Sequence, residues 1–177
     1  NNNFFDFVYI AANQTFYASN ANSVFKSTTG DRGDWTNIGT SKPGFPNNLV
    51  RVELAVCSSD PEVMYVLGSV GGTASNTYVS NNGGDTWTSR SAPGVIPGQD
   101  FTNGQAWYDL DIAVDPFNCG HIIAGGVPAF ESFLQGVSWA PLPGNMHVDQ
   151  HNITFDPQIQ GRVLFGNDGG IWLSNNG

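Results

Sequence analysis

One short segment, residues 147–151 (His-Val-Asp-Gln-His), alternates side chains that could bind a metal ion with side chains that could not. In a β-strand, successive side chains point to opposite faces, so His147, Asp149 and His151 would share one face. Two imidazoles and a carboxylate suit Zn²⁺ or another divalent transition metal. Same-face positions are about 7 Å apart along a strand. A hydrogen-bonded structural cluster is therefore the alternative to a metal site, and no other cofactor is expected.

Acidic residues suggest a second chemistry, glycoside hydrolysis. This reaction needs one acid and one base or nucleophile, with their carboxyl groups about 5 to 9.5 Å apart. Asp109 and Asp111 share a face of an expected inner strand, and Glu53 and Asp149 complete the set from which such a pair could be drawn. The alternative is that these acids cap turns and accept backbone N–H bonds.

Three aromatic residues, Trp107, Tyr108 and Trp172, could form a platform for sugar rings or could belong to the core. The nearby sequence Asn-Asp-Gly-Gly at 167–170 lacks the alternating oxygen ligands of an EF-hand, and we interpret it as a tight hairpin. The aromatic residues are thus the candidate ligand-binding residues.

Repeated hairpins indicate the scaffold that must position these residues. Trp35, Trp87 and Trp139 are each 52 residues apart, and each follows a Ser-initiated cluster of small residues, at 27–35, 80–87 and 132–139. A fourth such cluster begins at Ser174. The Gly and Asn residues of these clusters supply the positive φ angles of a tight turn.

A second marker runs in parallel with the hairpins. Apolar strands precede Asp-Pro turns at 60–61, 115–116 and 156–157, and further strands are expected at 63–68, 121–126 and 162–166. Each repeat is therefore a four-stranded meander. Such units, stacked around an axis, predict an all-β protein with a β-propeller fold, and a β-sandwich is the alternative.

The predicted chain contains about three and a half four-stranded antiparallel blades of a larger propeller. Their ranges are 1–45, 46–95, 105–145 and an incomplete 146–177. This prediction places the start of the chain after the first strand of its first repeat. An unclosed propeller leaves blade faces exposed, so we expect the remainder of the propeller to be a partner.

Composition limits the classes of partner. The formal net charge is −9 with only 12% charged residues, which disfavours nucleic acid and anionic membranes. No apolar run approaches the roughly 20 residues needed to cross a bilayer. The two cysteines, Cys57 and Cys119, lie in equivalent parts of neighbouring repeats, so an inter-blade disulfide and two free thiols both remain open.

The hairpin at 80–87 resembles the bacterial neuraminidase repeat, or Asp-box, Ser-x-Asp-x-Gly-x-Thr-Trp, with Asn82 in place of Asp. The hairpin at 132–139 has Leu134 at that position, and the one at 27–35 carries an insertion. The resemblance implies structural roles on outer hairpins for Ser27, Trp35, Ser80, Asn82, Gly84, Trp87, Ser132, Gly136, Trp139 and Ser174.

Longer motifs resemble large exported surface propellers of Bacteroidota. They are Trp-Tyr-Asp-Leu at 107–110, the segment 147–151, and Phe-Gly-Asn-Asp-Gly-Gly-Ile-Trp at 165–172. The resemblance implies a secreted or cell-surface bacterial protein, often followed by a type IX secretion sorting domain. It also implies relatives among sialidases, xyloglucanases and sortilin-type receptors.

Two functional hypotheses follow. The first is a non-catalytic or scaffolding propeller segment that binds a glycan or a cell-surface protein. The second is part of a glycoside hydrolase, xyloglucanase-like or sialidase-like, with its carboxylates on several blades. A sialidase would need three arginines for the substrate carboxylate. The chain has only four arginines, two of them beside the outer hairpins, which argues against sialidase activity.

Overall fold

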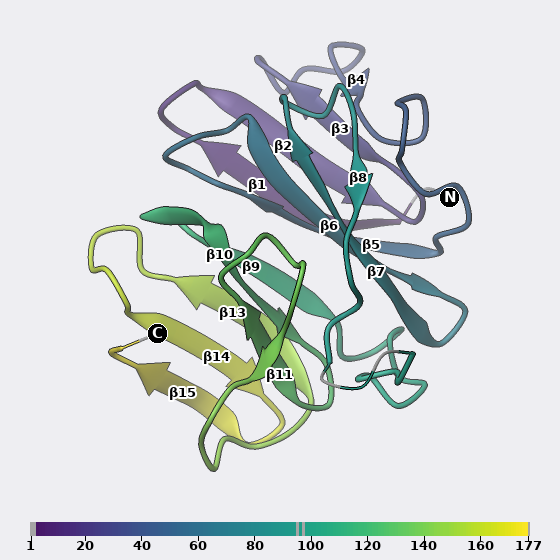
Figure 1. Ribbon diagram of the computed structural model, residues 1–177. Coiled ribbons are helices and arrows are strands. Elements are labelled where there is room, and N and C mark those ends of the chain that lie inside the picture. Colours follow the sequence, from purple (N-terminus) through teal and green to yellow (C-terminus); the bar gives the residue numbers. More distant parts are fainter. Residues whose placement is uncertain (1–2, 95, 97, 177) are drawn as a thin grey trace.

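The computed structural model describes residues 3–94, 96 and 98–176, and in this part of the chain every regular element is a β-strand. No helix among these residues is long and apolar enough to cross a membrane. The strands form four antiparallel sheets that stand side by side as the blades of a propeller (Figure 1). The all-β propeller class predicted from the sequence is therefore confirmed, and the β-sandwich alternative is wrong.

The blades follow one another in sequence order. Blade 1 contains β1 (Phe4–Ile10), β2 (Thr15–Asn20), β3 (Val24–Ser27) and β4 (Thr36–Asn37). Blade 2 contains β5 (Arg51–Val56), β6 (Val63–Val70), β7 (Thr73–Asn81) and β8 (Thr88–Ser89). Blade 3 contains β9 (Asp111–Asp115), β10 (Asn118–Gly125), β11 (Ala129–Ser132) and β12 (Ala140–Pro141). Blade 4 contains β13 (Gln150–Phe155), β14 (Val163–Asn167) and β15 (Gly170–Ser174).

Blade 1 differs from the sequence prediction. Its first strand, β1, pairs with β2 and completes a four-stranded sheet, so the expectation that the chain starts after this strand is wrong. β1 lacks the Asp-Pro turn that marks the later inner strands, because it runs into the turn Ala-Ala-Asn-Gln at residues 11–14 instead.

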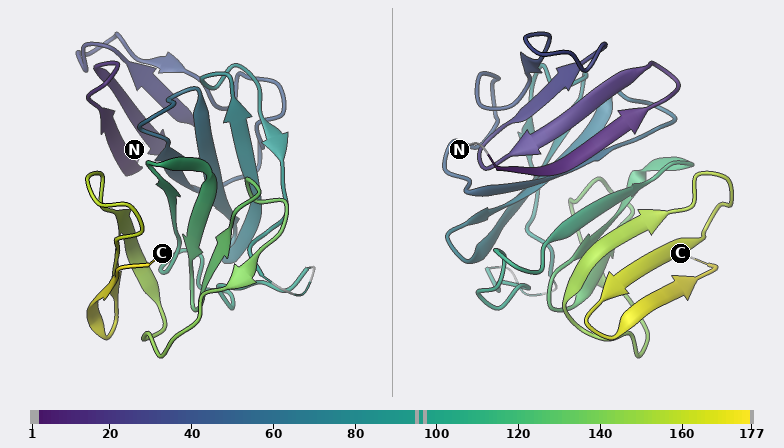
Figure 2. Two further views of the ribbon diagram at one scale, coloured as in Figure 1. Left: turned by 60° about the vertical axis from the view of Figure 1, so that its left-hand side comes forward. Right: turned by 180° about the vertical axis from the view of Figure 1, so that it is seen from behind.

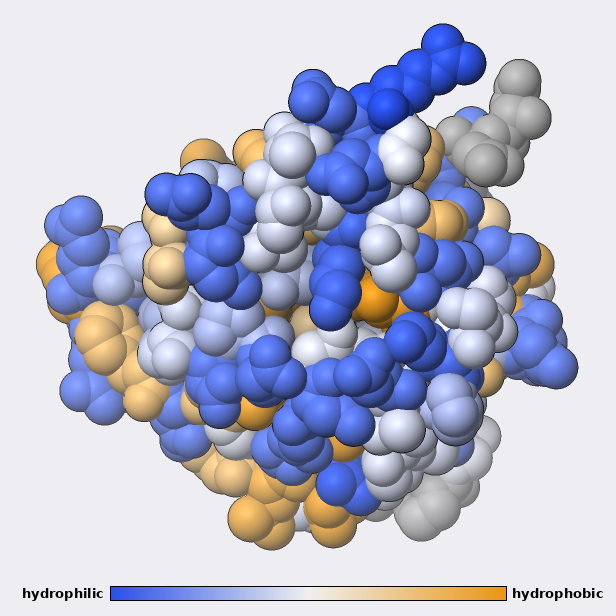
Figure 3. Space-filling model, turned by 90° about the horizontal axis from the view of Figure 1, so that it is seen from above, coloured by the Kyte–Doolittle hydropathy of each residue, from blue (hydrophilic) through white to orange (hydrophobic). Residues whose placement is uncertain are grey.

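Three apolar clusters fill the spaces between successive blades. One joins blades 1 and 2 around Ile38, Leu54 and Met64; the next joins blades 2 and 3, and the last joins blades 3 and 4 around Ile123 and Ile153. The sheets of blades 2 and 3 thus bury both faces. Figure 2 shows the arrangement of the four sheets from two further sides. Hydrophilic residues cover most of the surface seen from above, where hydrophobic residues gather in a few separate patches (Figure 3).

The Ser-initiated hairpins share one hydrogen-bonding scheme. In blade 2, the hydroxyl of Ser80 accepts bonds from the backbone N–H groups of Asn82 (3.3 Å) and Gly84 (2.9 Å). The hydroxyls of Ser132 and Ser27 accept equivalent bonds in blades 3 and 1. The same short side chain therefore shapes each turn.

Two of the three tryptophans reach back to the blade before their own. The indole Nε1 of Trp87 donates to the carbonyl of Ile38 in blade 1 at 2.8 Å, and that of Trp139 donates to the carbonyl of Ser91 in blade 2 at 3.2 Å. These hairpins therefore contribute to the contact between blades as well as to the turn.

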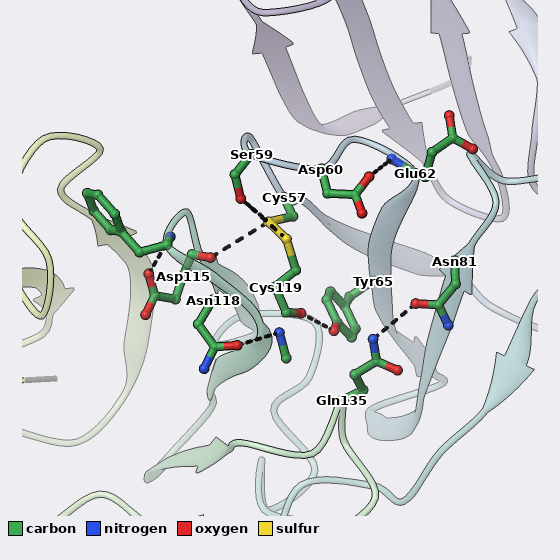
Figure 4. Close-up of a disulfide and its surroundings, with 12 residues drawn as sticks. Cys57, Ser59, Asp60, Glu62, Tyr65, Asn81, Asp115, Asn118, Cys119 and Gln135 are labelled. Carbon is green, nitrogen blue, oxygen red and sulfur yellow. Dashed lines mark hydrogen bonds between the residues drawn. A yellow bond between two sulfur atoms is a disulfide. The ribbon is translucent and has the colours of Figure 1, made fainter.

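A disulfide also joins blades 2 and 3. Cys57 and Cys119 are bonded, with their Cα atoms 5.5 Å apart, which decides between the two alternatives left open by the sequence (Figure 4). The hydroxyl of Ser59 lies 3.4 Å from one sulfur and 3.5 Å from the other. Close by, the Tyr65 hydroxyl donates to the carbonyl of Cys119, and its burial raises the pKa of the phenol.

Candidate functional site

Chain topology brings three separate segments to one end of blades 3 and 4. In an antiparallel meander, the loop that enters the first strand lies at the same end as the turn between the second and third strands. The loop before β9 holds residues 107–110, the loop before β13 holds residues 147–149, and Asp168 lies in the β14–β15 turn. These segments carry most of the chemistry that the sequence suggested.

An exposed aromatic pair lies on this end. Trp107 is 67% exposed and Tyr108 is 43% exposed, and their ring centroids are 5.6 Å apart. Their exposure corrects the alternative in which both belong to the core. A large aromatic surface that remains in solvent is available to stack against a ligand ring.

A histidine–aspartate pair contacts Tyr108. The carboxylate Oδ1 of Asp168 lies 2.7 Å from Nε2 of His151 and accepts a bond from the Tyr108 hydroxyl at 3.1 Å. The Tyr108 and His151 rings meet edge to face, with centroids 4.7 Å apart. The bond with His151 holds the pKa of Asp168 below its usual range, so this carboxyl is ionised.

Asp109, the next residue after the aromatic pair, is an unusual carboxyl group. Its side chain is 0% exposed, and neither of its oxygens has a hydrogen-bond partner. Burial, with a smaller contribution from the charge of the neighbouring Asp149, raises the pKa of Asp109 to about 6. A carboxyl group with this pKa exchanges its proton near neutral pH, which is the property required of a general acid or of a pH-sensitive binding group.

Asp149 interrupts the alternation on which the metal hypothesis rests. Its φ is +63°, a left-handed conformation that is uncommon for a residue other than glycine, and β13 begins only at the next residue. Its N–H donates to the carbonyl of Val127 at 3.0 Å. His147, Asp149 and His151 therefore do not line up on one strand face.

The two histidines of that segment have separate surroundings. Nδ1 of His147 lies 3.0 Å from the carbonyl of Val148, and its Cβ packs so closely on Gly169 that a side chain there would overlap it. His151 is paired with Asp168 instead. In the part of the chain that the structure describes, no three His, Cys, Asp or Glu side chains form a group that could hold a metal ion. His147, Asp149 and His151 thus have separate hydrogen-bond partners, Val148, Val127 and Asp168.

Asp111 belongs to a different environment, the inner strands near the propeller axis. It is buried, and it accepts bonds from its neighbour Ile112 (2.9 Å) and from the N–H of Ile153 in the next blade. Burial raises the pKa of Asp111 well above its usual value, with a further contribution from Glu53. Asp109 and Asp111 are therefore not a pair, because one faces the loop end and the other bonds the inner strand of blade 4.

Glu53 is held by an arginine in the same inner region. Arg51 Nε donates to Glu53, and its two terminal nitrogens donate to the carbonyls of Ala106 (3.3 Å) and Leu110 (2.9 Å). Burial nonetheless raises the pKa of Glu53 to about 7, because desolvation outweighs the attraction of the guanidinium group. These contacts anchor the loop that carries Trp107, Tyr108 and Asp109.

Trp172 lies apart from the other two aromatic residues. It lines a cavity of about 420 Å³ together with Leu142, Met146 and Phe165, on the outer part of blade 4. The structure thus divides the predicted three-membered platform into a pair, Trp107 and Tyr108, and a separate residue.

Sequence reasoning missed three residues. Asp168 was interpreted only as part of a hairpin turn, although its place in a turn between the second and third strands could have indicated the same end as Tyr108. Arg51 is one of the four arginines that the sequence offers only as a count against sialidase activity, and Asp6 lies on β1, which the sequence does not predict as a strand. Asp6 accepts a bond from the N–H of Leu54 at 2.9 Å, the same inter-blade contact that Asp111 makes with blade 4.

Comparisons with known proteins support the fold. No family model and no curated protein sequence matches the chain. Among solved structures, a GH74 enzyme of Niastella koreensis superposes with a TM-score of 0.71 at 16% identity, over 97% of this chain and 28% of that one. The GH74 xyloglucanase of Xanthomonas campestris gives 0.66 at 18% identity, over 95% and 28%.

Propellers with other titles are also similar. A structure of YCF48 bound to D1 peptide superposes with a TM-score of 0.54 at 12% identity, over 99% of this chain and 67% of that one. At these identities the similarity shows the fold alone. The chain spans about a quarter of the length of the GH74 enzymes that it matches, at 23%, 28% and 28%.

Proposed function

We propose that this chain is a glycan-binding segment of a β-propeller in an exported cell-surface protein, and that the exposed pair Trp107 and Tyr108 forms its binding surface. The observation that carries the proposal is the exposure of this pair beside the His151–Asp168 pair, to which Tyr108 is hydrogen-bonded. Sugar rings present apolar C–H faces that stack on aromatic rings, while carboxylates accept bonds from sugar hydroxyls.

The charge of the site indicates the class of glycan. Asp109, Asp149 and Asp168 lie near Tyr108. No lysine or arginine side chain bonds to any of the three in the described structure, and the chain as a whole has a net charge of −9. Anionic sugars would be repelled. The surface therefore fits neutral glycans better than sialic or uronic acids.

The same proposal covers the type of hairpin, the cellular compartment and the role of the scaffold. The Ser-initiated hairpins are Asp-box hairpins, with Asn82 in the place of the usual Asp. The protein is secreted in the manner of the Bacteroidota surface propellers it resembles, and the Cys57–Cys119 disulfide supports an oxidising compartment. Its scaffold role is to hold the binding surface on rigid blades.

The test is a binding titration with neutral oligosaccharides, read out by calorimetry and by tryptophan fluorescence. We expect saturable binding that Trp107→Ala weakens by at least tenfold, since a lost stacking ring costs about 1.4 kcal/mol or more. Trp172→Ala is the matched control, because it removes a partly exposed tryptophan of another surface and should leave the affinity unchanged. Equal effects of the two variants would contradict the proposal.

A second candidate, part of a glycoside hydrolase, rests on one specific observation. Asp109 has a pKa of about 6 and a second carboxyl group, Asp149, beside it, which is the electrostatic pattern of an acid and its partner. Its test is hydrolysis of the bound glycan by the complete protein. Turnover that Asp109→Asn abolishes while binding persists would favour this candidate over the non-catalytic one.

A further inference from the structure

A groove of about 750 Å³ lies at the outer contact between blades 2 and 3. The start of β7 contributes Thr73 and Asn76, the segment after β8 contributes Arg90 and Ser91, and the third hairpin contributes Ser138. None of the residues that line this groove belongs to the candidate site described above. Its volume is that of a small-molecule site and is far larger than a single ion needs. We call it the Arg90 groove.

Hydrogen bonds between the two blades fix the walls of the Arg90 groove. The N–H of Ser91 donates to the carbonyl of Gly136 at 3.0 Å, and its hydroxyl donates to the carbonyl of Val137 at 3.0 Å. In return, the indole of Trp139 donates to the carbonyl of Ser91. The groove is therefore formed by the fold itself, which lowers the cost of ordering a binding site.

Arg90 is the cation of this groove, and its side chain has no acidic partner. Its Nε is buried without a hydrogen-bond acceptor, and no ion pair or hydrogen bond of its guanidinium group is found among the described residues. On the neighbouring strand, the hydroxyl of Thr77 is also buried without a partner, and the N–H of Arg90 donates to the Thr77 carbonyl at 2.7 Å. Buried polar atoms normally have partners, so these two orphaned groups indicate a site for a polar ligand.

The other cations of the chain are in different situations. Three have acidic partners and one bonds to a carbonyl, while Arg32 is exposed on the first hairpin: the pairs are Lys42–Asp85, Arg51–Glu53 and Arg162–Asp156, and Lys26 donates to Gly83. In the part of the chain that the structure describes, Arg90 thus combines partial burial with the lack of any partner. A partly buried charge is costly unless an opposite charge accompanies it.

Asp100, the acid that lines the groove, does not supply this opposite charge. Its Oδ1 accepts bonds from the N–H of Ala74 (3.1 Å) and from the N–H (3.1 Å) and hydroxyl (2.8 Å) of Thr102. Its Oδ2 accepts a bond from the N–H of Gly104 at 2.7 Å. This carboxylate is therefore occupied in bracing the loop against β7, and the anion that Arg90 requires must come from a ligand.

We propose that the Arg90 groove binds an acidic oligosaccharide, which carries a carboxylate or a sulfate group, and that Arg90 pairs with this anionic group. A guanidinium group forms two parallel bonds to such an oxyanion. The uncharged polar side chains of Thr73, Asn76 and Ser138 can donate and accept, as sugar hydroxyls require. A nucleotide fits less well, because Trp139, the aromatic residue that lines the groove, is only 9% exposed and offers no ring face to a base.

This site goes beyond the function proposed above, because its charge preference is the opposite. The surface at Trp107 and Tyr108 is surrounded by acids and should take neutral glycans, whereas the Arg90 groove should take acidic ones. The two surfaces would then select different parts of a mixed polysaccharide. Each can be tested without the other.

The test is calorimetric titration of the full chain with three trisaccharides: trigalacturonate, its neutral methyl ester, and a sulfated galactan trisaccharide. We expect saturable binding of at least one acidic trisaccharide and no binding of the ester at this site; the one that binds identifies the anionic group. Failure of both acidic trisaccharides to bind would overturn the proposal. Sodium sulfate that binds as tightly as the trisaccharide would also overturn it, because the groove would then recognise an anion and no sugar.

Variants locate the binding in the groove. Arg90→Gln should weaken the affinity for the acidic trisaccharide by roughly tenfold or more, because a charge-assisted pair is lost. Arg32→Gln is the matched control, since it removes the same charge from an exposed position on blade 1. Ser138→Trp should block the groove without removing a hydrogen bond of the described structure. Equal effects of Arg90→Gln and Arg32→Gln would refute the assignment.

The outcome is distinguishable from that of the neutral-glycan proposal. Arg90→Gln and Ser138→Trp should leave the binding of neutral oligosaccharides unchanged, and Trp107→Ala should leave the binding of the acidic trisaccharide unchanged. Loss of acidic-trisaccharide binding in Trp107→Ala but not in Arg90→Gln would overturn the second site, because the ligand would then occupy the aromatic surface.

Discussion

Removal of the disulfide between blades 2 and 3 gives a prediction whose size can be worked out from the structure. Cys57 and Cys119 are 62 residues apart in sequence. A cross-link that closes a loop of this length removes chain entropy from the unfolded state equivalent to about 4 kcal/mol at room temperature. The double variant Cys57→Ala/Cys119→Ala should therefore have a free energy of unfolding lower by about this amount.

The assay is urea denaturation followed by tryptophan fluorescence, with reduced wild-type protein as the control. Reduction and the double variant should give the same loss of stability, because both leave the surrounding blade contacts in place. A loss below about 1 kcal/mol in the double variant would refute the reasoning, since it would mean that residual structure already restricts the unfolded chain without the cross-link.

The remaining predictions concern the inner strands and the hairpins. Glu53 has a pKa of about 7 in the folded protein, above its usual value of 4.5. Its contribution to the free energy of unfolding should therefore be fully present near pH 4 and be lost as the pH rises through 7. In Glu53→Gln, the midpoint of thermal unfolding should change less with pH across this range. Gly84→Ala should lower the free energy of unfolding, measured by chemical denaturation, by at least about 2 kcal/mol, because φ is +88° and a Cβ would lie 2.8 Å from Ile38. The control Gly71→Ala, at a position with positive φ but open space around it, should lower it by only about 1 kcal/mol. Ser80→Ala should cost about 1 kcal/mol in the same assay, because the Gly84 N–H loses its acceptor; no loss would contradict the role given to this hydroxyl.

Local patterns in the sequence predict the fold well because each repeat is marked by interactions between residues that are close in sequence. The spacing of Trp35, Trp87 and Trp139 and the Ser-initiated turns require only neighbouring residues to form a hairpin. The strand β1 was missed for the same reason, because it has neither the Asp-Pro turn nor the strict alternation of the later inner strands. Its membership of a blade is decided by pairing with β2.

The candidate site was harder to predict because it depends on contacts between segments that are far apart in the sequence. Asp109, Asp149 and His151 were named from the sequence, but their partners were not. The pairing of His151 with Asp168 joins two segments of blade 4, and the pKa of Asp109 depends on a loop from the next blade. Strand alternation also failed at Asp149, where one left-handed residue separates His147 from His151.

The direction of the inter-blade bonds has a consequence for how such proteins can diversify. The acids Asp6 and Asp111 bond forward to the following blade, whereas Trp87 and Trp139 bond backward to the preceding one. Each contact between two blades therefore depends on residues of both blades. Exchange of a single whole blade would separate hydrogen-bond donors from their acceptors at both of its contacts. Recombination that cuts through the middle of two successive blades, and so moves a junction intact, should yield viable chimaeras more often than exchange of whole blades.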